Sequence, residues 1–484
     1  MTLPETKMGA VHKHQIIEKA ITDLIEKNIL KEGDAVPSIR KMSMLYNMSP
    51  TPVIEAYKNL EAKGVIESHP KSRFTVAVSN QDPEAEEQTS SDPFPVVFTS
   101  RRKELPNPYA KTKSTIELDL SRPDMERGIV PADRCLKYII RTLKNDPGVL
   151  NIDSRGYDDE KLVRIITRQM LQSMCAIKKE EICITGKGIE ETIRLALKAC
   201  TRSNDTVILT SPCSPAHVYA CRALGLRHTF VHHSAGGHSV DIDAFEHMIR
   251  KDRNIKCLLI SGGLINPDGY YPDNECKERL ANICRQYDIA VIEDDSDRAL
   301  FFGDRYPKLF KELIPEQTIY VSSFTTSILN ELNIHWACPG KYTRVYRMMR
   351  DNESFSAYAF LQKALAEFAE TSQYRSCLEA TRALLKKTIS QVRKAVFENF
   401  PGGILVSDPD GGFNLHIILP ETIRNVRLKG LAYNNGIGIS CDNEFFLEEN
   451  GIVVNCSVIA ADMNKIKSIE TLGTLANSAI SLKQ

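Results

Sequence analysis

Polar side chains at the ends of apolar segments are the residues of this sequence best placed to bind a small molecule. Asp294 closes an apolar run, Asn266 lies in the turn I-N-P-D-G, and Glu190 and Glu191 open a predicted helix after Gly188. Acids in the first turn of a helix stabilise it through the helix dipole and repel a phosphate bound there. If Glu190 and Glu191 face inward, this charge favours a neutral or cationic ligand, with an amine or a ring nitrogen, over a phosphate ester. Taken singly, Asp294 and Asn266 each fit a structural role equally well.

Histidines form a second cluster, which invites a metal-binding interpretation. His228, His232, His233 and His238 lie in or beside a Ser/Gly-rich run. No carboxylate or cysteine stands at ligand spacing near them, so an exposed loop is the better interpretation and no metal site is predicted. The 13 cysteines include no C-x-x-C pair. Buried, reduced thiols are therefore expected, which favours a cytoplasmic protein.

The composition sets limits on the kind of protein. A chain of 484 residues is too long for one core and predicts two or three domains. Its 62 basic and 62 acidic residues balance, so no global charge attracts nucleic acid or a membrane, and any nucleic-acid site must be local. No apolar run reaches the length of a membrane span, and the N-terminus lacks a signal-peptide core.

Three short helices and two short strands are predicted near the N-terminus. Apolar spacing marks a helix over 12–28, Ser38 caps a second over 39–46 with Met42 and Leu45 facing inward, and Ser49 caps a third that reaches about residue 63. Two strands follow at 65–68 and 74–77. The segment that joins them holds three potentially cationic side chains, His69, Lys71 and Arg73.

Two further regions follow. Residues 79–114 are polar and punctuated by prolines, acidic in the first half and basic at Arg101, Arg102 and Lys103 in the second. They are expected to be a flexible linker that spans roughly 30–36 Å as a free coil. From residue 115 onward, buried strands alternate with amphipathic helices, which predicts a doubly covered, mostly parallel α/β sheet. Expected strands lie at 181–185, 207–210, 257–260, 290–293 and 318–321. The α/β part is expected to end near 372, and a smaller α+β part to occupy 373–484.

The N-terminal pattern resembles the winged helix-turn-helix of the GntR family. The resemblance rests on the words P-S-I-R-K-M-S, S-P-T-P-V-I-E-A-Y-K-N-L-E-A-K-G-V-I-E-S and H-P-K-S-R within 8–78. It implies binding to double-stranded DNA, with a phosphate contact from Arg40 and a basic wing tip in the minor groove. Pro50 stands where many members carry a DNA-contacting arginine. Base contacts therefore depend on Ser49 and Thr51, with Lys58 as a backbone contact.

Protein contact alone is the other use of such a domain, but the basic wing argues against it. Residues 1–78 contain eleven Lys and Arg against nine Asp and Glu, a net charge of only +2. One copy would therefore bind DNA weakly, and two-fold pairing on a repeated half-site is expected.

Residues 115–484 resemble fold-type I aminotransferases, and in particular the MocR-type regulators, in which such a domain is joined to a GntR-type reader. The matching words are D-L-S-R-P-D, R-G-Y-D-D-E-K-L, I-N-P-D-G and V-I-E-D-D-S-D, in that order. The resemblance implies a homodimer and a pocket for pyridoxal 5'-phosphate (PLP). It places Asp294 against the pyridine nitrogen of PLP and Asn266 against the ring hydroxyl.

Other positions of that pocket depart from the family. Thr326 stands at the position of the lysine that forms the Schiff base, and Asn333 at that of a phosphate-binding arginine. Ser214 and Ser296 replace aromatic residues. The phosphate cup, which begins at Gly188, carries Glu190 and Glu191, and the strand 451–455 offers no arginine for a substrate carboxylate. A lost arginine–phosphate pair forfeits on the order of 1.5–3 kcal/mol.

The sequence therefore predicts a DNA-binding transcription regulator whose aminotransferase-like domain is not an enzyme, binds no cofactor, and serves dimerisation and effector sensing. One alternative is a regulator that binds PLP without the Schiff base. The other is a working aminotransferase with a relocated lysine, but Lys187, Lys308 and Lys341 are expected to be surface charges. An absent nucleophile commonly costs an enzyme many orders of magnitude in rate.

Overall fold

A computed structural model of the chain divides into two compact units, residues 1–100 and 101–484. The structure describes residues 13–26, 30, 34–46, 48–69, 73–76, 116–126, 128–130, 132–233, 239–324, 332–354, 356–445 and 450–480. The predicted linker at 79–114, the wing residue Lys71, and Thr326 and His238 lie outside these residues.

The described residues of the first unit form three helices and a two-stranded antiparallel sheet, as the sequence predicts. Its elements are α1 (Lys13–Glu26), α2 (Ile39–Leu45), α3 (Pro50–Ala62), β1 (Ile66–His69) and β2 (Arg73–Val76). Ile17, Met42 and Val53 supply buried side chains from the three helices, and Ile66 adds one from β1. Leu45 is 72% exposed, so the prediction that it faces inward is wrong. Its position at the end of the short helix α2 leaves it beyond the core that Met42 enters.

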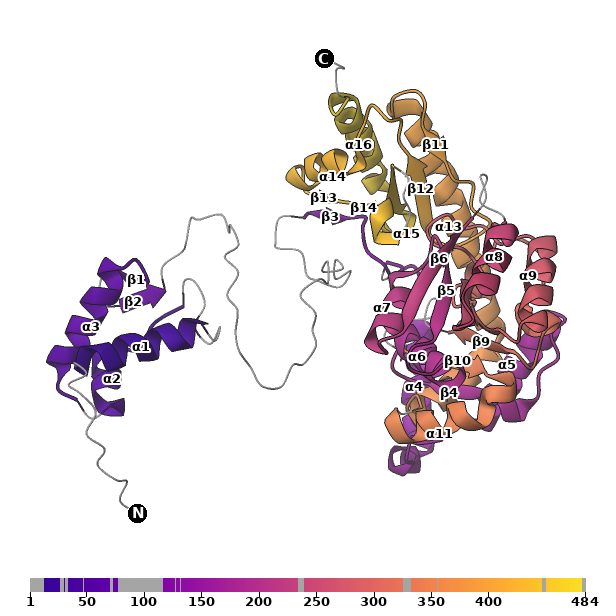
Figure 1. Ribbon diagram of the computed structural model, residues 1–484, viewed down its shortest axis with the longest axis horizontal. Coiled ribbons are helices and arrows are strands. Elements are labelled where there is room, and N and C mark those ends of the chain that lie inside the picture. Colours follow the sequence, from indigo (N-terminus) through magenta and orange to yellow (C-terminus); the bar gives the residue numbers. More distant parts are fainter. Residues whose placement is uncertain are drawn as a thin grey trace. The chain divides into compact units, whose positions relative to one another are not determined.

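The second unit is built on a seven-stranded sheet with the order β4-β10-β9-β8-β7-β5-β6 (Figure 1). Neighbours from β9 to β6 are parallel, while β10 runs antiparallel to both β4 and β9. The strands are β4 (Cys183–Thr185), β5 (Thr206–Ser211), β6 (Arg227–His232), β7 (Ile255–Ser261), β8 (Ala290–Asp294), β9 (Thr318–Ser323) and β10 (His335–Cys338).

Helices cover both faces of this sheet, which explains why most of its strands read as continuous apolar runs. In Figure 1, α6 and α7 lie on one side of the sheet and α8 and α9 on the other, in agreement with their separate cores. The helices are α4 (Ala132–Asn145), α5 (Glu160–Gln172), α6 (Ile189–Cys200), α7 (Pro215–Ala223), α8 (Ile242–Lys251), α9 (Asn274–Gln286), α10 (Phe310–Leu313), α11 (Thr343–Glu353) and α12 (Ala359–Ala369).

Aspartates set the start of several of these helices. The side chains of Asp159, Asp241 and Asp273 accept backbone N–H groups at the first turns of α5, α8 and α9. Such caps satisfy donors that the helix itself leaves unpaired. Shorter 3-10 turns are η1 (Pro147–Asn151), η2 (Lys179–Glu181), η3 (Arg298–Leu300), η5 (Gly340–Tyr342), η6 (Asp442–Phe445) and η7 (Met463–Ile466).

The C-terminal part of this unit is a smaller α+β layer, which we call the small part (372–480). Its central sheet has the order β11-β12-β15-β14, and β13 pairs in parallel with β3 from residues 118–119. The elements are β3 (Leu118–Asp119), α13 (Ser372–Asn399), β11 (Leu405–Val406), β12 (Asn414–Ile418), α14 (Asn425–Asn434), β13 (Ile437–Gly438), β14 (Ser440–Cys441), β15 (Gly451–Asn455), α15 (Cys456–Ala461) and α16 (Lys467–Ser478).

The part of the histidine-rich segment that the structure describes belongs to a strand, where the sequence predicted a loop. His228 and His232 belong to β6, and His233 bridges to Val240. β6 is the last strand in the sheet order, and its sequence R-H-T-F-V-H holds only two apolar residues, as suits a strand at the edge of a sheet. That polar composition hid the strand among the apolar runs of the sequence. Among the described residues, no group of His, Cys, Asp and Glu is arranged to hold a metal ion.

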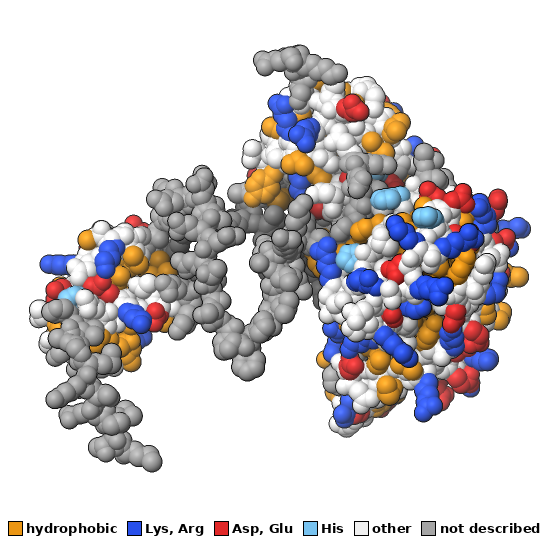
Figure 2. Space-filling view, viewed as in Figure 1, with side chains coloured by type: hydrophobic (Ala, Val, Ile, Leu, Met, Phe, Trp, Pro, Cys, Tyr) orange, Lys and Arg blue, Asp and Glu red, His pale blue; other side chains and the backbone are white. Residues whose placement is uncertain are grey.

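Two observations concern the surface. Basic and acidic side chains are interspersed on the face of the larger unit that Figure 2 shows, as expected from a neutral chain. Within the described part of the chain, none of the helices combines the length and apolarity that crossing a membrane requires.

Candidate functional site

The surface predicted to contact DNA lies at the start of α3. Val53, Ala56, Tyr57 and Leu60 turn into the core, and the hydroxyl of Tyr57 donates to the carbonyl of Pro37. This fixes α3 against the segment before α2 and leaves its other face outward. The predicted contact residues of the helices are all exposed, namely Arg40, Ser49, Thr51 and Lys58.

The caps of these helices are partly as predicted. Ser38 accepts the N–H of Lys41 at 3.3 Å and caps α2. Ser49 occupies the N-cap position of α3 but makes no capping hydrogen bond through its side chain. Its hydroxyl is therefore not engaged by the helix end. Of the wing residues, His69 ends β1 and Arg73 begins β2, opposite each other in the register.

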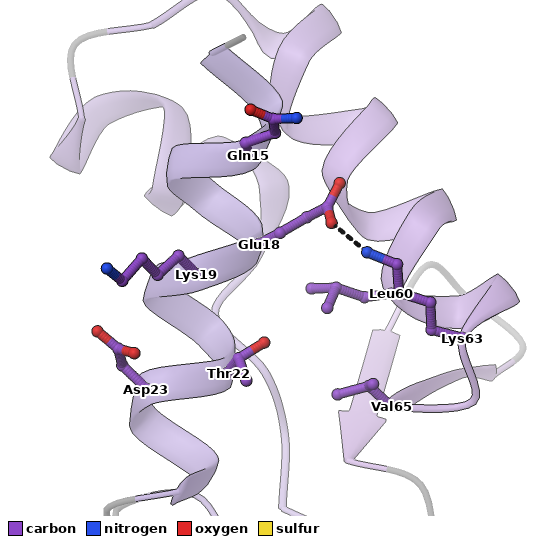
Figure 3. A pocket seen from close by; sticks show the side chains of 8 residues that line it. All are labelled: Gln15, Glu18, Lys19, Thr22, Asp23, Leu60, Lys63 and Val65. Carbon is purple, nitrogen blue, oxygen red and sulfur yellow. Dashed lines mark hydrogen bonds and ion pairs between the residues drawn. The ribbon is translucent and has the colours of Figure 1, made fainter. Parts of the chain in front are cut away.

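A hollow of ≈ 560 Å³ lies between α1 and the end of α3 (Figure 3). Glu18 is the centre of its polar contacts, because its carboxylate accepts from Lys63 at 2.6 Å and from Asn59 at 2.7 Å. The hydrogen bond from Lys63 lowers the pKa of Glu18. The hollow lies at the opposite end of α3 from Thr51. We therefore interpret it as part of the packing between α1 and α3 and not as a surface that contacts bases. Its lining residues are Gln15, Glu18, Lys19, Thr22, Asp23, Leu60, Lys63 and Val65.

The candidate pocket of the second unit is centred on Asp294, at the carboxyl end of β8. Its Oδ2 lies 2.8 Å from Nε2 of His217, and its Oδ1 accepts the hydroxyl of Ser296 at 2.5 Å and the Ser296 N–H at 3.1 Å. Burial alone would raise the pKa of Asp294, but the partners His217 and Ser296 outweigh it and lower that pKa. Asp294 is therefore an ionised carboxylate already held by two partners.

His217 was not identified from the sequence. It lies in the first turn of α7, its side chain is fully buried, and Ser214 caps the same helix by accepting the N–H of Ala216. Only one feature of the sequence could have identified His217: it lies three residues after Ser214, a position that the family resemblance singles out. The Nδ1 atom of His217 has no hydrogen-bond partner among the described residues.

Asn333 and Gly188 lie together at the start of α6. A Cβ on Gly188 would stand 4.0 Å from Oδ1 of Asn333, and both residues have positive φ, +93° for Gly188 and +47° for Asn333. An amide thus faces the helix start, where the family resemblance expects an arginine. An amide offers hydrogen bonds but no charge to a phosphate.

The two glutamates of α6 differ from each other. Glu191 is buried and pairs with Arg194 on the same helix, whereas Glu190 is exposed, as is Lys187 just before the helix. The pairing of Glu191 removes much of the negative potential that the sequence led us to expect at this end. The repulsion of a phosphate by this helix is consequently weaker than predicted.

Asn266 is held from the small part of the unit. Its Oδ1 accepts from Nδ2 of Asn414, on β12, at 2.9 Å. Asn414, like His217, was missed from the sequence because 148 residues separate it from its partner. His335, at the start of β10, completes the neighbourhood: burial lowers its pKa to about 4, so it is neutral near pH 7.

Two of the lysines considered as relocated anchors lie on the surface. Lys308 pairs with Glu278 at 2.5 Å and Lys341 with Asp288 at 2.9 Å, and the side chains of both lysines are more than a third exposed. This confirms that they are surface charges. Lys277 is fully buried, but its amine donates to the carbonyls of Gly262 and Lys308.

The residues around Asp294 fit only half of a PLP molecule. Asp294 and Asn266 suit the pyridine ring and its hydroxyl, but Asn333 brings no cation to the start of α6. Position 326 is a threonine, which has no amine for a covalent link. The described residues therefore do not form a complete site for PLP as a catalytic cofactor.

Comparison with known proteins agrees with this division of the chain. Residues 13–76 match the family "Bacterial regulatory proteins, gntR family", and residues 166–455 match "Aminotransferase class I and II". The chain belongs to the aminotransferase class I and II family and carries a GntR-type helix-turn-helix domain ahead of it. This is the MocR-type arrangement of a DNA-binding regulator, and the predicted fold-type I aminotransferase architecture is confirmed.

The similar proteins include a transcription regulator that matches most of the chain and aminotransferases that match its second unit. The HTH-type transcriptional regulator YjiR of Escherichia coli is 27% identical over 92% of this chain and 95% of its own length. The 2-aminoadipate transaminase of Thermus thermophilus is 23% identical over 59% of this chain and 72% of its own. The structure of LysN, an α-aminoadipate aminotransferase of Thermus thermophilus, covers 76% of this chain and 93% of its own, with a TM-score of 0.66 at 19% identity.

Proposed function

We propose that the chain is a transcription regulator whose aminotransferase-like domain is non-catalytic and serves dimerisation and effector sensing. The observation that carries the proposal is the pocket around Asp294. It keeps an ionised carboxylate and the amide of Asn266, whereas threonine and asparagine replace the lysine and the arginine of a PLP enzyme. Binding groups without a nucleophile are suited to recognition rather than to reaction.

The effector that suits this pocket is neutral or cationic and contains nitrogen. Asp294 accepts three hydrogen bonds, one from His217 and two from Ser296, and a carboxylate has about four lone-pair sites. One site is left for an amine or a ring N–H. The argument rests on Asp294 and Asn333, because Glu191 is neutralised by Arg194.

DNA binding in this proposal depends on two copies. The helix contacts from Arg40, Ser49, Thr51 and Lys58 are few, and residues 1–78 carry a net charge of only +2. Pairing of two chains through their aminotransferase-like domains would present two readers to a repeated half-site. An effector would change transcription by favouring one placement of the readers over another, by as much as its affinity differs between the two placements.

A regulator that binds PLP without a covalent link is the second candidate. Asp294 and Asn266 favour it, since they stand at the two ring positions that PLP would use. It differs from the first proposal in its ligand, because a phosphate would have to bind beside Asn333 without a cation.

Thermal-shift measurements on the full chain separate the two candidates. We expect pyridoxamine, other amines and amino acids to raise Tm, and phosphorylated metabolites to leave it unchanged. Asp294→Ala should abolish the shift, while Lys308→Ala, a surface variant, should keep it. Stabilisation by PLP and other phosphorylated compounds, with none by amines, would establish the second candidate and refute the first.

A further inference from the structure

Two paired strands, β12 and β15, hold two parts of the second unit: β12 holds the pocket turn at Asn266, and β15 holds the chain segment that leads from the DNA-binding domain. Residues 116–126, which follow the linker, lie against the small part: β3 pairs with β13, and the N–H groups of Leu118 and Leu120 donate to the carbonyls of Gly436 and Gly438 at 3.0 and 2.8 Å. We call residues 116–126 the anchor segment.

Asn455, the last residue of β15, holds the anchor segment at a second place. Its Nδ2 donates to the carbonyls of Arg122 and Asp124 at 2.9 and 2.8 Å, and its N–H donates to the carbonyl of Leu120 at 2.9 Å. Ser457 adds a bond, because its hydroxyl accepts the N–H of Glu126 at 2.7 Å. The anchor segment is thereby fixed to the end of β15.

On the neighbouring strand β12, Asn414 holds Asn266, one of the residues predicted to line the pocket. Asn414 and Asn455 are partners in the β12–β15 register, so their side chains leave the same face of the sheet. Asn414 binds Asn266 in the turn after β7, and Asn455 binds the anchor segment. Asn266 is thus linked to residues 116–126 through the side chain of Asn414 and the paired strands β12 and β15. A displacement of Asn266 can reach residues 116–126 along this path.

His416 gives the same turn a second attachment. Its Nδ1 lies 2.6 Å from Asp268 and its Nε2 lies 2.8 Å from Asp442, while Asp442 also accepts the N–H of Gly451 at 2.6 Å. All of these groups are buried, and a Cβ on Gly451 would come within 2.4 Å of Nε2 of His416. The turn 266–269 and β12 are therefore expected to move together.

We propose that Asn414 and His416 are positioning residues that transmit the state of the pocket, through β12 and β15, to the anchor segment and so to the DNA-binding domain. This inference rests on the proposed function, since it gives the route by which a bound effector would be sensed. It requires no contact between the two units other than the chain itself.

Hydrogen–deuterium exchange on the ligand-free full chain tests the route. The reporters are the amides of Leu118 and Leu120. Asn266→Ala removes a partly exposed side chain of the pocket turn, so the fold should tolerate it. We expect exchange of both amides to be roughly two- to tenfold faster in Asn266→Ala, because one supporting hydrogen bond is lost. Asn414→Ser should have a similar effect.

The double variant and a matched control complete the test. Asn266→Ala with Asn414→Ser should exchange no faster than the single variants, because both remove the same bond. Asn450→Ala should leave the reporters unchanged, since its side chain holds Leu419, Pro420 and Ile423 within the small part. The proposed route would be overturned if the two amides exchanged in Asn266→Ala at the wild-type rate. It would also be overturned if the rate increases of the two single variants multiplied in the double variant. Because no ligand is used, a failed ligand screen would refute the proposed function without bearing on this result.

Discussion

Asn414 and Asn455 face each other across β12 and β15, and their side chains bind two segments that are far apart in sequence, the turn at Asn266 and the carbonyls of Arg122 and Asp124. Residues 116–126 follow the linker from the DNA-binding domain, so these contacts form the route that we propose from the pocket to that domain.

The wing prediction concerns Lys71 and Arg73. Changing both to Ala should weaken binding to all DNA sequences, because a wing in the minor groove acts on phosphates and groove potential. The slope of log Kd against log salt concentration should fall by roughly 0.9 for each lost phosphate contact. Lys19→Ala, an exposed change on α1, should leave the slope as it is. Equal affinity of the double variant and the wild type at several salt concentrations would exclude the wing as a contact.

Alkaline destabilisation is expected from His416. Burial disfavours its charge, but its hydrogen bonds to Asp268 and Asp442 prevail and raise its pKa to about 10. A folded-state pKa above the unfolded value of about 6.5 gives stability that is fully present below pH 6.5 and is lost as pH rises toward about 10. His416→Gln should cost about 3–5 kcal/mol at pH 7, because it leaves two buried carboxylates without a cation.

Denaturant unfolding, followed by the fluorescence of Trp336, is the measurement for His416, since Trp336 is the one tryptophan of the chain and lies buried on β10. The wild type should lose stability between pH 7 and 10, and His416→Gln should not. His335→Gln is the matched control: with a pKa of about 4, His335 is neutral throughout this range. An identical pH profile for His416→Gln and the wild type would refute the assignment.

Removal of the Asp294 carboxylate tests the pocket's internal pairing. Asp294→Asn weakens the partner of the buried His217 and should lower the free energy of unfolding by about 1–3 kcal/mol. Because the pKa of Asp294 is lowered in the fold, its stabilising contribution is present above the unfolded pKa of about 3.9 and is lost as pH falls through the folded pKa. The difference from the wild type should therefore be larger at pH 7 than below pH 4. Ser296→Ala keeps the His217 pair and should cost less.

Local sequence patterns predicted much of this structure, whereas contacts between distant residues were not predictable. Strands such as β5 and β9 read as apolar runs because both faces of the sheet are covered. His217 lies 77 residues from its partner Asp294, and Asp268 lies 148 residues from its partner His416, and no periodicity reports such pairings. Glu191 is a different case, because its partner is local: its place in a first helical turn suggested free negative charge, but Arg194, three residues further along the same helix, pairs with it.

The central claim, that the aminotransferase-like domain is not a PLP enzyme, is tested most directly by incubating the full chain with PLP and recording its absorbance, followed by borohydride reduction and peptide mass analysis. With threonine at position 326, we predict no shift of the PLP absorbance band to longer wavelength and no pyridoxyl group on any lysine of the pocket. A saturable long-wavelength band, together with a stoichiometric adduct on one lysine, would contradict the account.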